Sequence, residues 1–240
     1  MTDAKSTSAK APARAAWILN LRRLNETEED ALAPVFDERW GEIQDTHRAF
    51  VERFLSMLPS DGRVLDAACG TGKYFAMVLD SGRSLLGVDH AGAYLAVAGT
   101  KFPQVPTEKH DLHDLPYREE FDGVMCIDAM EMVPPEDWPI VLQRFRQSLR
   151  PSGWLYLTVE LHPEDEIRAM TDEARHRGFP VVDGEILWKE SGYHFYPPME
   201  RVRRWLGEAG LTIEDDTQGP WDHGYAYHHV LARVATMNQR

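Results

Sequence analysis

The middle of the chain alternates between short apolar runs and amphipathic stretches. Apolar runs of strand length lie at residues 64–69, 84–88, 105–115, 121–128 and 154–161. Segments with a helical spacing of apolar residues lie between them, at 75–79, 91–99 and 136–149. This alternation is typical of a parallel sheet with helices packed against it, so the sequence predicts an α/β domain.

The segments before this core predict helices. Residues 1–15 are polar, rich in alanine and unpatterned, and we interpret them as a disordered tail. The apolar residues Trp17, Ile18, Leu21 and Leu24 predict a short packed helix. A second helix is expected to be capped by Asp45 and to end at 59–62. Residues 16–60 would then form a helical lid in front of the core.

The part after residue 161 predicts an insert and the end of the sheet. A polar helix is expected at 163–177, and residues 181–189 predict a hairpin with Asp183-Gly184 at its turn. A helix at 199–209 and strands at 211–215 and 225–234 follow. We therefore expect a single domain over 16–240, divided into the lid at 16–60, the core at 61–161, the insert at about 162–198 and the C-terminal part of the sheet at 199–236.

Composition and charge narrow the class of protein. The chain has 240 residues, 43% of them hydrophobic, which is enough for one domain with a sizeable core. The net charge of -13 argues against broad nucleic-acid binding, which needs a positive surface. No apolar run is long enough to span a membrane, and the first residues lack the apolar centre of a secretory leader. The two cysteines lie in apolar strand patterns, so we expect free thiols and a cytoplasmic protein.

A turn with two glycines follows the first predicted strand. Gly70 and Gly72 separate this strand from a helix, the arrangement that opens nucleotide-binding α/β units. A dinucleotide site prefers a small residue three positions after the second glycine, but Phe75 stands there. The next apolar run ends in Asp89, 23 positions after Asp66. This is close to the usual gap to the carboxylate that binds a ribose, although Asp89 also suits the start of a helix.

The spacing Asp66-x-Ala68-x-Gly70-x-Gly72 resembles the first motif of the class I S-adenosylmethionine (SAM)-dependent methyltransferases. Ala68 replaces the more common glycine of that motif. Further stretches resemble the family in the expected order, and the resemblance covers about residues 34–161. They are Phe36-Asp37, Leu115-Pro116-Tyr117, Phe121-Asp122-Gly123-Val124, the loop 129–134 and Arg150-Pro151-Ser152-Gly153.

The resemblance implies a fold, an activity and a cofactor site. The fold would be Rossmann-like, a seven-stranded, mostly parallel sheet with an antiparallel C-terminal strand and helices on both faces. The activity would be transfer of the SAM methyl group to O or N of a small molecule, with S-adenosylhomocysteine (SAH) as product. Asp111 and Leu112 would meet the adenine. The full expected cofactor set is Asp66, Ala68, Gly70, Gly72, Asp89, His90, Asp111, Leu112, Ile127 and Met132.

The acceptor is expected against the insert. Aromatic residues gather there and predict either a substrate wall or a core patch under a long crossover. The expected substrate residues are Trp188, Tyr193, Tyr196 and Trp221. His194 and His223, in loops after the core, are candidate general bases, while Asp128 and Glu131 lie next to the expected reaction site. Such a pocket suits a small planar or cationic acceptor.

Other interpretations remain open at this stage. An RNA or protein methyltransferase, a SAM-binding scaffold without catalysis and a nicotinamide dehydrogenase are the alternatives. We expect no metal, because His110 and His113 lack a clear third ligand in the sequence. We expect no nucleic-acid partner and no membrane partner, and a monomer or a homodimer.

Overall fold

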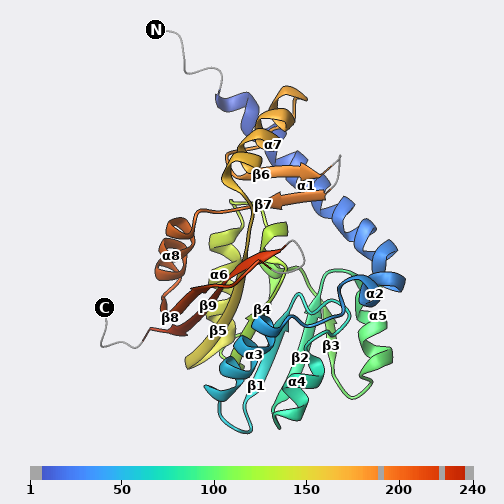
Figure 1. Ribbon diagram of the computed structural model, residues 1–240, viewed down its shortest axis with the longest axis vertical. Coiled ribbons are helices and arrows are strands. Elements are labelled where there is room, and N and C mark those ends of the chain that lie inside the picture. The colour runs from blue at the N-terminus through green and yellow to red at the C-terminus, as the bar shows by residue number, and fades with distance from the viewer. Residues whose placement is uncertain (1–6, 189–191, 222–224, 236–240) are drawn as a thin grey trace.

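The computed structural model describes residues 7–188, 192–221 and 225–235, built around one seven-stranded sheet (Figure 1). The strand order is β3-β2-β1-β4-β5-β9-β8. Strand β9 runs antiparallel to both of its neighbours, whereas β1 to β5 pair in parallel. The strands are β1 (Arg63–Ala67), β2 (Ser84–Asp89), β3 (Thr107–Lys109), β4 (Phe121–Cys126), β5 (Leu149–Leu161), β8 (Leu211–Gln218) and β9 (Ala226–Val234). The Rossmann-like fold class is confirmed.

Helices cover both faces of the sheet because the strand residues are apolar on both sides. On β1, Val64 belongs to the core cluster of one face and its neighbour Leu65 to that of the other. The first face packs against α3 (Asp45–Ser56), α4 (Phe75–Asp80) and α5 (Gly92–Lys101). The second packs against α6 (Trp138–Ser148) and α8 (Met199–Glu208). Apolar runs buried on both faces are typical of parallel sheets.

The N-terminal helix is longer than the sequence predicts. Helix α1 spans Thr7–Leu32, followed by the 3-10 turn η1 (Ala33–Val35) and the short helix α2 (Phe36–Trp40). The expected disordered tail is therefore corrected from residue 7 onwards, while residues 1–6 lie outside the described part. Arg14 explains the difference, since its guanidinium binds Glu136 and Glu185 far along the chain. Within the described residues, no helix is both long and apolar enough to cross a bilayer.

The insert contains a helix and a hairpin, but the hairpin is displaced from its predicted position. Helix α7 spans Glu164–His176, and β6 (Glu185–Trp188) pairs with β7 (Gly192–Phe195). Asp183-Gly184 does form a turn, but the prediction that this turn joins the two strands of the hairpin was wrong, because it precedes β6. Gly184 has a φ of +89° there, and its carbonyl accepts the Tyr196 N–H at 2.9 Å. Two 3-10 turns, η2 (Leu112–Asp114) and η3 (Met130–Met132), follow β3 and β4.

Candidate active site

A cavity of about 820 Å³ lies where the parallel strands end. Its wall is formed by the segments after β1, β2, β3 and β4 and by Glu160 near the end of β5. Ligands of open α/β sheets bind at this edge, where the strand order reverses between β1 and β4. Residues of α1 and α2 complete the wall, among them Asn25, Glu29 and Phe36. The position and volume fit a small-molecule site.

The loop after β1 exposes its backbone to the cavity. Ala68 and Gly70 line the wall, and both have positive φ angles, 65° and 53°. A Cβ added at Gly70 would meet nothing closer than 4.0 Å, the Phe36 ring. The face of Gly70 is therefore open for the close approach of a ligand. Thr71 is held by its hydroxyl, which donates to Asp37 at 2.5 Å, so the aromatic-acidic segment of α2 fastens this loop.

Gly72 serves packing and is not among the residues that line the cavity. Its φ is +81°, and an added Cβ would lie 2.9 Å from the Phe75 ring. The Phe75 ring also fills the space beside Gly87, where a Cβ would meet it at 2.5 Å. Phe75, the large residue that argued against a dinucleotide site, thus packs under the loop. A contact of Gly72 with a ligand stays a prediction.

Asp89 lies at the end of β2 with both carboxylate oxygens turned into the loop. It accepts the Gly70 N–H at 2.8 Å and the Ala91 N–H at 2.8 Å. Burial raises the pKa of Asp89, and the two N–H bonds oppose that effect. Asp89 also lines the cavity, and each carboxylate oxygen can accept a further hydrogen bond. Asp89 therefore joins the loop after β1 to the start of the segment after β2.

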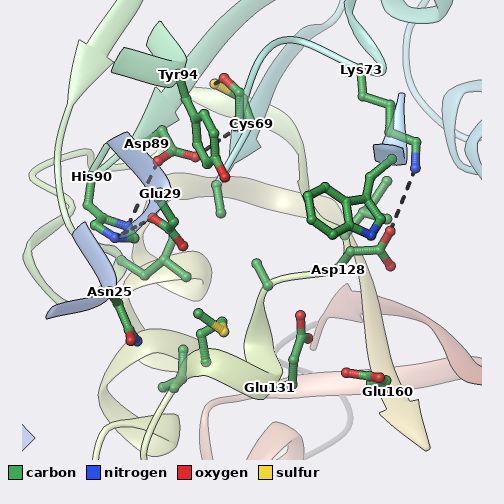
Figure 2. Close-up of a pocket in the computed structure, with 18 of the residues that line it drawn as sticks. Asn25, Glu29, Cys69, Lys73, Asp89, His90, Tyr94, Asp128, Glu131 and Glu160 are labelled. Carbon is green, nitrogen blue, oxygen red and sulfur yellow. Dashed lines mark hydrogen bonds and ion pairs between the residues drawn. The ribbon is translucent and has the colours of Figure 1, made fainter. Parts of the chain in front are cut away.

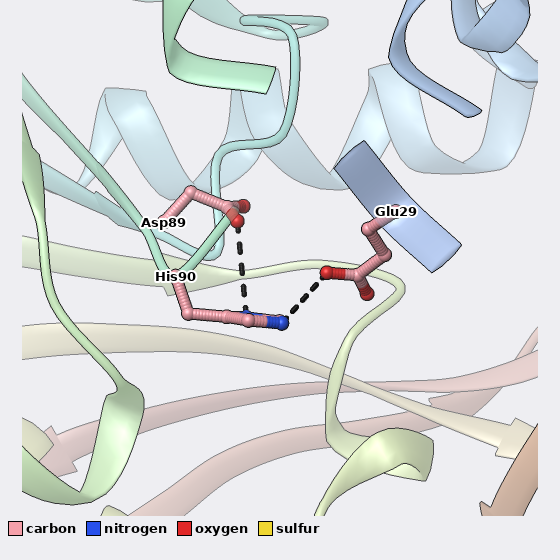
Figure 3. A group of neighbouring side chains, drawn as sticks. All are labelled: Glu29, Asp89 and His90. Atoms are coloured by element: carbon pink, nitrogen blue, oxygen red, sulfur yellow. Dashed lines mark ion pairs between the residues drawn. The ribbon is translucent and has the colours of Figure 1, made fainter. Parts of the chain in front are cut away.

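His90 and Glu29 connect the core to the N-terminal helix (Figure 3). The His90 Nε2 atom lies 2.7 Å from Glu29 Oε2, and its Nδ1 atom lies 3.8 Å from Asp89. Burial lowers the pKa of His90, but Glu29, Asp89 and Asp111 outweigh it and raise the pKa to about 9. The imidazole is therefore charged at neutral pH. The three side chains also have metal-ligand types, with donor atoms within 4.8 Å of one another. Because Asp89 already accepts from two backbone amides, we interpret Glu29, Asp89 and His90 as an ion-paired cluster that joins α1 to the core.

The segments after β3 and β4 form the next part of the wall. Asp111, Leu112, Ile127 and Met132 all line the cavity, as the sequence predicts for a cofactor site. The Asp111 carboxylate also pairs with His113, its Oδ1 atom lying 2.6 Å from His113 Nδ1. These side chains come from two segments, after β3 and after β4, and both segments lie at the same edge of the sheet.

Asp66 is buried behind the wall and does not line the cavity. Burial and the nearby Asp89 charge raise the pKa of Asp66 to about 8, and its buried Oδ2 atom has no hydrogen-bond partner among the described residues. The side chain is therefore a neutral acid near pH 7. Any part it takes in cofactor binding would act through the loop above it, and its direct contact with a ligand stays a prediction.

The protonated Asp66 predicts how stability changes with pH. The folded state keeps the proton up to about pH 8, whereas the unfolded chain releases it near the usual pKa of an aspartate. Stability from this group is full below that usual value and is lost as the pH rises to about 8, by up to about 1.4 kcal/mol per pH unit. The free energy of unfolding of Asp66→Asn should therefore rise relative to that of the unchanged chain as the pH rises. Urea unfolding of both proteins at several pH values measures this difference. Parallel profiles would contradict the assignment.

Asp128, in the segment after β4, lines the cavity with a strained backbone. Its φ is +53°, and its N–H donates to the Thr158 hydroxyl at 2.8 Å. The carboxylate lies 3.2 Å from the buried His47 and 3.9 Å from the Lys73 ammonium. Burial raises the pKa of Asp128, but these two partners and Tyr227 outweigh it and lower the pKa. Asp128 is therefore a fixed negative charge in the wall.

Two more carboxyl groups lie beyond Asp128, on the side of the cavity away from Asp89 (Figure 2). Glu131 comes from η3 and Glu160 from β5, and both are buried. His194 of β7 lines the same part of the wall, with its Nδ1 atom 3.5 Å from Glu160 and 2.9 Å from the Tyr196 hydroxyl. Burial and the nearby His162 lower the pKa of His194 to about 4, so this imidazole is neutral.

The core of the chain is similar to known methyltransferases. Residues 64–153 match the family model of the methyltransferase domain. A ubiquinone biosynthesis O-methyltransferase of Pseudomonas fluorescens is 27% identical over 64% of this chain and 66% of its own length. A tRNA (carboxymethyluridine(34)-5-O)-methyltransferase of Arabidopsis thaliana is 28% identical over 59% of this chain and 34% of its own length. The chain thus spans about two thirds and one third of these relatives.

Residues 64–153 are similar to a methyltransferase domain, and the chain has the fold of the class I SAM-dependent methyltransferases. A solved structure with the same fold is the Burkholderia thailandensis 1,6-didemethyltoxoflavin-N1-methyltransferase, crystallised with its substrate and SAH. It is 18% identical, covers 98% of this chain and 94% of its own, and has a TM-score of 0.64. The open face of Gly70 and the cavity-lining Asp89 and Asp111 fit the SAM cofactor that this family uses.

The substrate residues predicted for this methyltransferase do not line its cavity and are corrected. Side chains alternate along β7, so His194 faces the cavity while Tyr193 and Phe195 enter the core. The Tyr193 hydroxyl donates to the buried Glu185 at 2.6 Å. Tyr196 is buried behind His194, and Trp188 and Trp221 are exposed outside the cavity. The predicted base His223 lies outside the described residues.

Other residues of the methyltransferase cavity were missing from the predicted site. Lys73 directly follows Gly72, and Glu160 lies near the carboxyl end of the last parallel strand. Both could have been predicted, because ligands of such sheets bind at the carboxyl ends of the strands. Glu29 gave no local signal, because it reaches the site from a helix and lies 61 positions before His90 in the chain. The aromatic side chains that do line the wall are Phe36, Trp40, Tyr74, Tyr94, Tyr225 and Tyr227.

The alanine in the methyltransferase's first motif predicts a stabilising substitution. A left-handed backbone costs an L-residue roughly 1–2 kcal/mol, and Ala68 has a φ of 65°. Glycine removes this strain but adds about 0.4–1 kcal/mol of chain entropy in the unfolded state. We therefore expect Ala68→Gly to raise the free energy of unfolding by about 0.5 kcal/mol, measured by urea unfolding.

A matched control for this prediction is Ala96→Gly, the same change at an exposed position of α5. There the backbone is helical, so the substitution should cost about 1 kcal/mol. Equal losses at both positions would show that Ala68 is unstrained.

Proposed function

We propose that this protein transfers the methyl group of SAM to an oxygen or nitrogen atom of a small-molecule acceptor and releases SAH. The observation that carries the proposal is that one cavity joins two different sets of side chains. One half presents the Gly70 loop, Asp89 and Asp111, and the other presents Glu131, Glu160 and His194. A cofactor half next to an acceptor half is what a two-substrate transfer requires.

The cofactor half would hold SAM through the loops after β1, β2 and β3. Asp89 would accept hydrogen bonds from the ribose hydroxyls, and Asp111 with Leu112 would contact the adenine. When bound, SAM supplies a methyl group that its sulfonium makes electrophilic. The chain's own task is then to orient the acceptor and to exclude water. Residues of α1 and α2 close the cavity from outside, which suits that task.

The charge of the cavity favours a small acceptor over a nucleic acid. Among the described residues, nine acidic side chains and four cationic ones, Arg22, Arg39, Lys73 and the charged His90, line the wall. Three of these cations lie on carboxylates: Arg22 on Asp137, Lys73 on Asp128 and His90 on Glu29. Phosphate groups would meet an acidic surface with few available cations. One relative acts on tRNA, but the acidic wall of this cavity disfavours RNA as the substrate of this chain.

The setting and partners of the protein stay part of this proposal. Cys69 and Cys126 are buried and unpaired, which fits a reducing compartment such as the cytoplasm. A small-molecule methyl acceptor is the partner that the cavity supports. A monomer and a homodimer are both compatible with the described surface.

Calorimetric titration tests the proposed function directly. SAM, SAH and NAD would be titrated separately into the purified full chain. Micromolar binding of SAM and SAH without binding of NAD is the expected result, because the loop lacks the third small residue of a dinucleotide site. Binding of NAD alone, or binding of none of the three, would overturn the proposal.

A further inference from the structure

Glu131 and Glu160 are two acids buried in the wall of the acceptor half. Glu131 is 9% exposed and Glu160 is 7% exposed. The Glu131 Oε2 atom is buried without a hydrogen-bond partner among the described residues, and Figure 2 shows the Glu131 carboxyl group pointing into the cavity. Polar atoms buried to this degree are nearly always paired, so this oxygen lacks a partner that a ligand can supply.

The pair has no permanent cation within the described residues. The basic side chain paired with Glu160 is His194, whose Nδ1 atom lies 3.5 Å from the carboxyl group. That imidazole is neutral near pH 7. The Lys73 ammonium lies on Asp128 instead. The titratable groups that act on the pair include Asp128, Glu29, His194, Tyr196 and Tyr227. None of them brings a positive charge to the two carboxyl groups.

The pair therefore holds protons in the free protein. Burial, then the charges of Glu160 and Asp128, raises the pKa of Glu131 well above its usual range. Burial and Asp128 raise the pKa of Glu160 to about 8. Two such acids ionise readily only when a cation arrives between them. A ligand with a positive charge would thus gain an ion pair and expel a proton, whereas a neutral ligand would not.

We propose that Glu131 and Glu160 form the ammonium-binding site of an amine acceptor, and that its nitrogen is the atom methylated. This inference rests on the proposed function and names the substrate class of the same cavity. Two buried carboxylates around one nitrogen can accept hydrogen bonds from two of its N–H groups. A phenolate would bring no cation to the pair and would add a negative charge near the fixed charge of Asp128, which disfavours O-methylation of a phenol.

The proposal includes one proton transfer. An ammonium nitrogen has no lone pair, so it must lose a proton before it can act as a nucleophile. The proton passes from nitrogen to a Glu160 oxygen, and the electron pair of that N–H bond stays on nitrogen as the lone pair. The protonated carboxyl later returns the proton to solvent. Glu160 suits this step better than His194, because a base works best when its pKa lies near the working pH.

Carboxyl titration by NMR tests the site without knowledge of the natural acceptor. The full chain, labelled with ¹³C at the glutamate carboxyl carbons and saturated with SAH, would be titrated with pH in methylammonium chloride and in sodium chloride of equal concentration. Glu131→Gln and Glu160→Gln would assign the two signals. Both apparent pKa values of the pair should lie above the usual range of a glutamate in sodium chloride. We expect methylammonium to lower them by about one unit, since the cation stabilises the ionised form.

The controls separate this inference from the proposed function. Glu208→Gln, on the exposed side of α8, should leave the response unchanged, whereas Glu131→Gln should abolish it at Glu160. Identical titration of the pair in the two salts, with SAH bound, would overturn the amine site and leave the methyltransferase proposal intact. Failure of the chain to bind SAH would instead count against the proposed function itself.

A second readout follows transfer to simple acceptors. The chain with SAM would be incubated with phenethylamine and with 2-phenylethanol, which differ at the reacting group, and methylated product would be measured by mass spectrometry. Methylation of the amine over the alcohol, lost in Glu160→Gln and retained in Glu208→Gln, is the expected result. Preference for the alcohol would overturn the inference.

Discussion

Asp89→Ala is expected to weaken SAM binding by at least about 100-fold. In the proposed cofactor site the carboxylate would accept from two ribose hydroxyls, and hydrogen bonds to a charged group contribute about 1.5–3 kcal/mol each. Loss of two such bonds removes about 3 kcal/mol or more, which is two orders of magnitude in Kd. The substitution also frees the Gly70 and Ala91 amides, so the loop that meets the cofactor loses an anchor at the same time.

Calorimetric titration of SAM and SAH measures this effect, and two further variants make it specific. Asp89→Asn keeps one acceptor oxygen at the same place and should lie between the unchanged chain and Asp89→Ala. Asp114→Asn changes a carboxylate whose side chain is 67% exposed and which does not line the cavity, so it should bind normally. Unchanged affinity in a folded Asp89→Ala protein would remove the ribose assignment.

The core of the fold was predictable because its signals are local. The residues 64–69 and 121–128 are apolar at nearly every position, which only a strand buried on both faces requires. Each strand is followed at once by a segment that meets the cavity, so Gly70 and Asp89 could be placed from their order along the chain, whereas Asp111 and Ile127 were expected from the family resemblance. The antiparallel strand β9 was also expected, from the family resemblance.

The acceptor half was predicted poorly because its signals are not local. The sequence shows that aromatic residues gather near 193–196, but not which of them face the cavity. A shift of one position along β7 exchanges the core face for the cavity face, and this decides between Tyr193 and His194. Glu160 was hidden in an otherwise apolar strand, although a carboxylate there is costly unless it has a role.

The length of α1 was missed for the same reason. Its first turns are rich in alanine and carry no apolar face, so the sequence alone resembles a tail. A long-range contact stabilises this part of the helix. The Arg14 side chain reaches Glu185 of β6 and Glu136 before α6, more than 100 positions away. Helices are set mostly by such tertiary contacts, which no local pattern reveals.

The buried ion pair of Arg14 and Glu185 gives the second large prediction. The Glu185 side chain is fully buried, and Arg14 donates to both of its oxygens, at 2.7 Å and 2.9 Å. Tyr193 and the Val182 N–H donate to the same carboxylate, each at 2.6 Å. These neutral donors orient Glu185, but Arg14 is the cation that balances its charge among the described residues. The pair therefore joins α1 to the hairpin of the insert.

Arg14→Met is expected to lower the free energy of unfolding by about 3 kcal/mol, because it leaves a buried carboxylate without its cation. Urea unfolding measures the loss, and hydrogen exchange should show faster exchange along the first half of α1. The double variant Arg14→Met/Glu185→Gln should recover part of the stability, since no charge is then buried. Arg175→Met is the control, because its partner Asp183 is 95% exposed and such surface pairs contribute less than about 1 kcal/mol. Equal losses for Arg14→Met and Arg175→Met would contradict the anchoring role of Arg14.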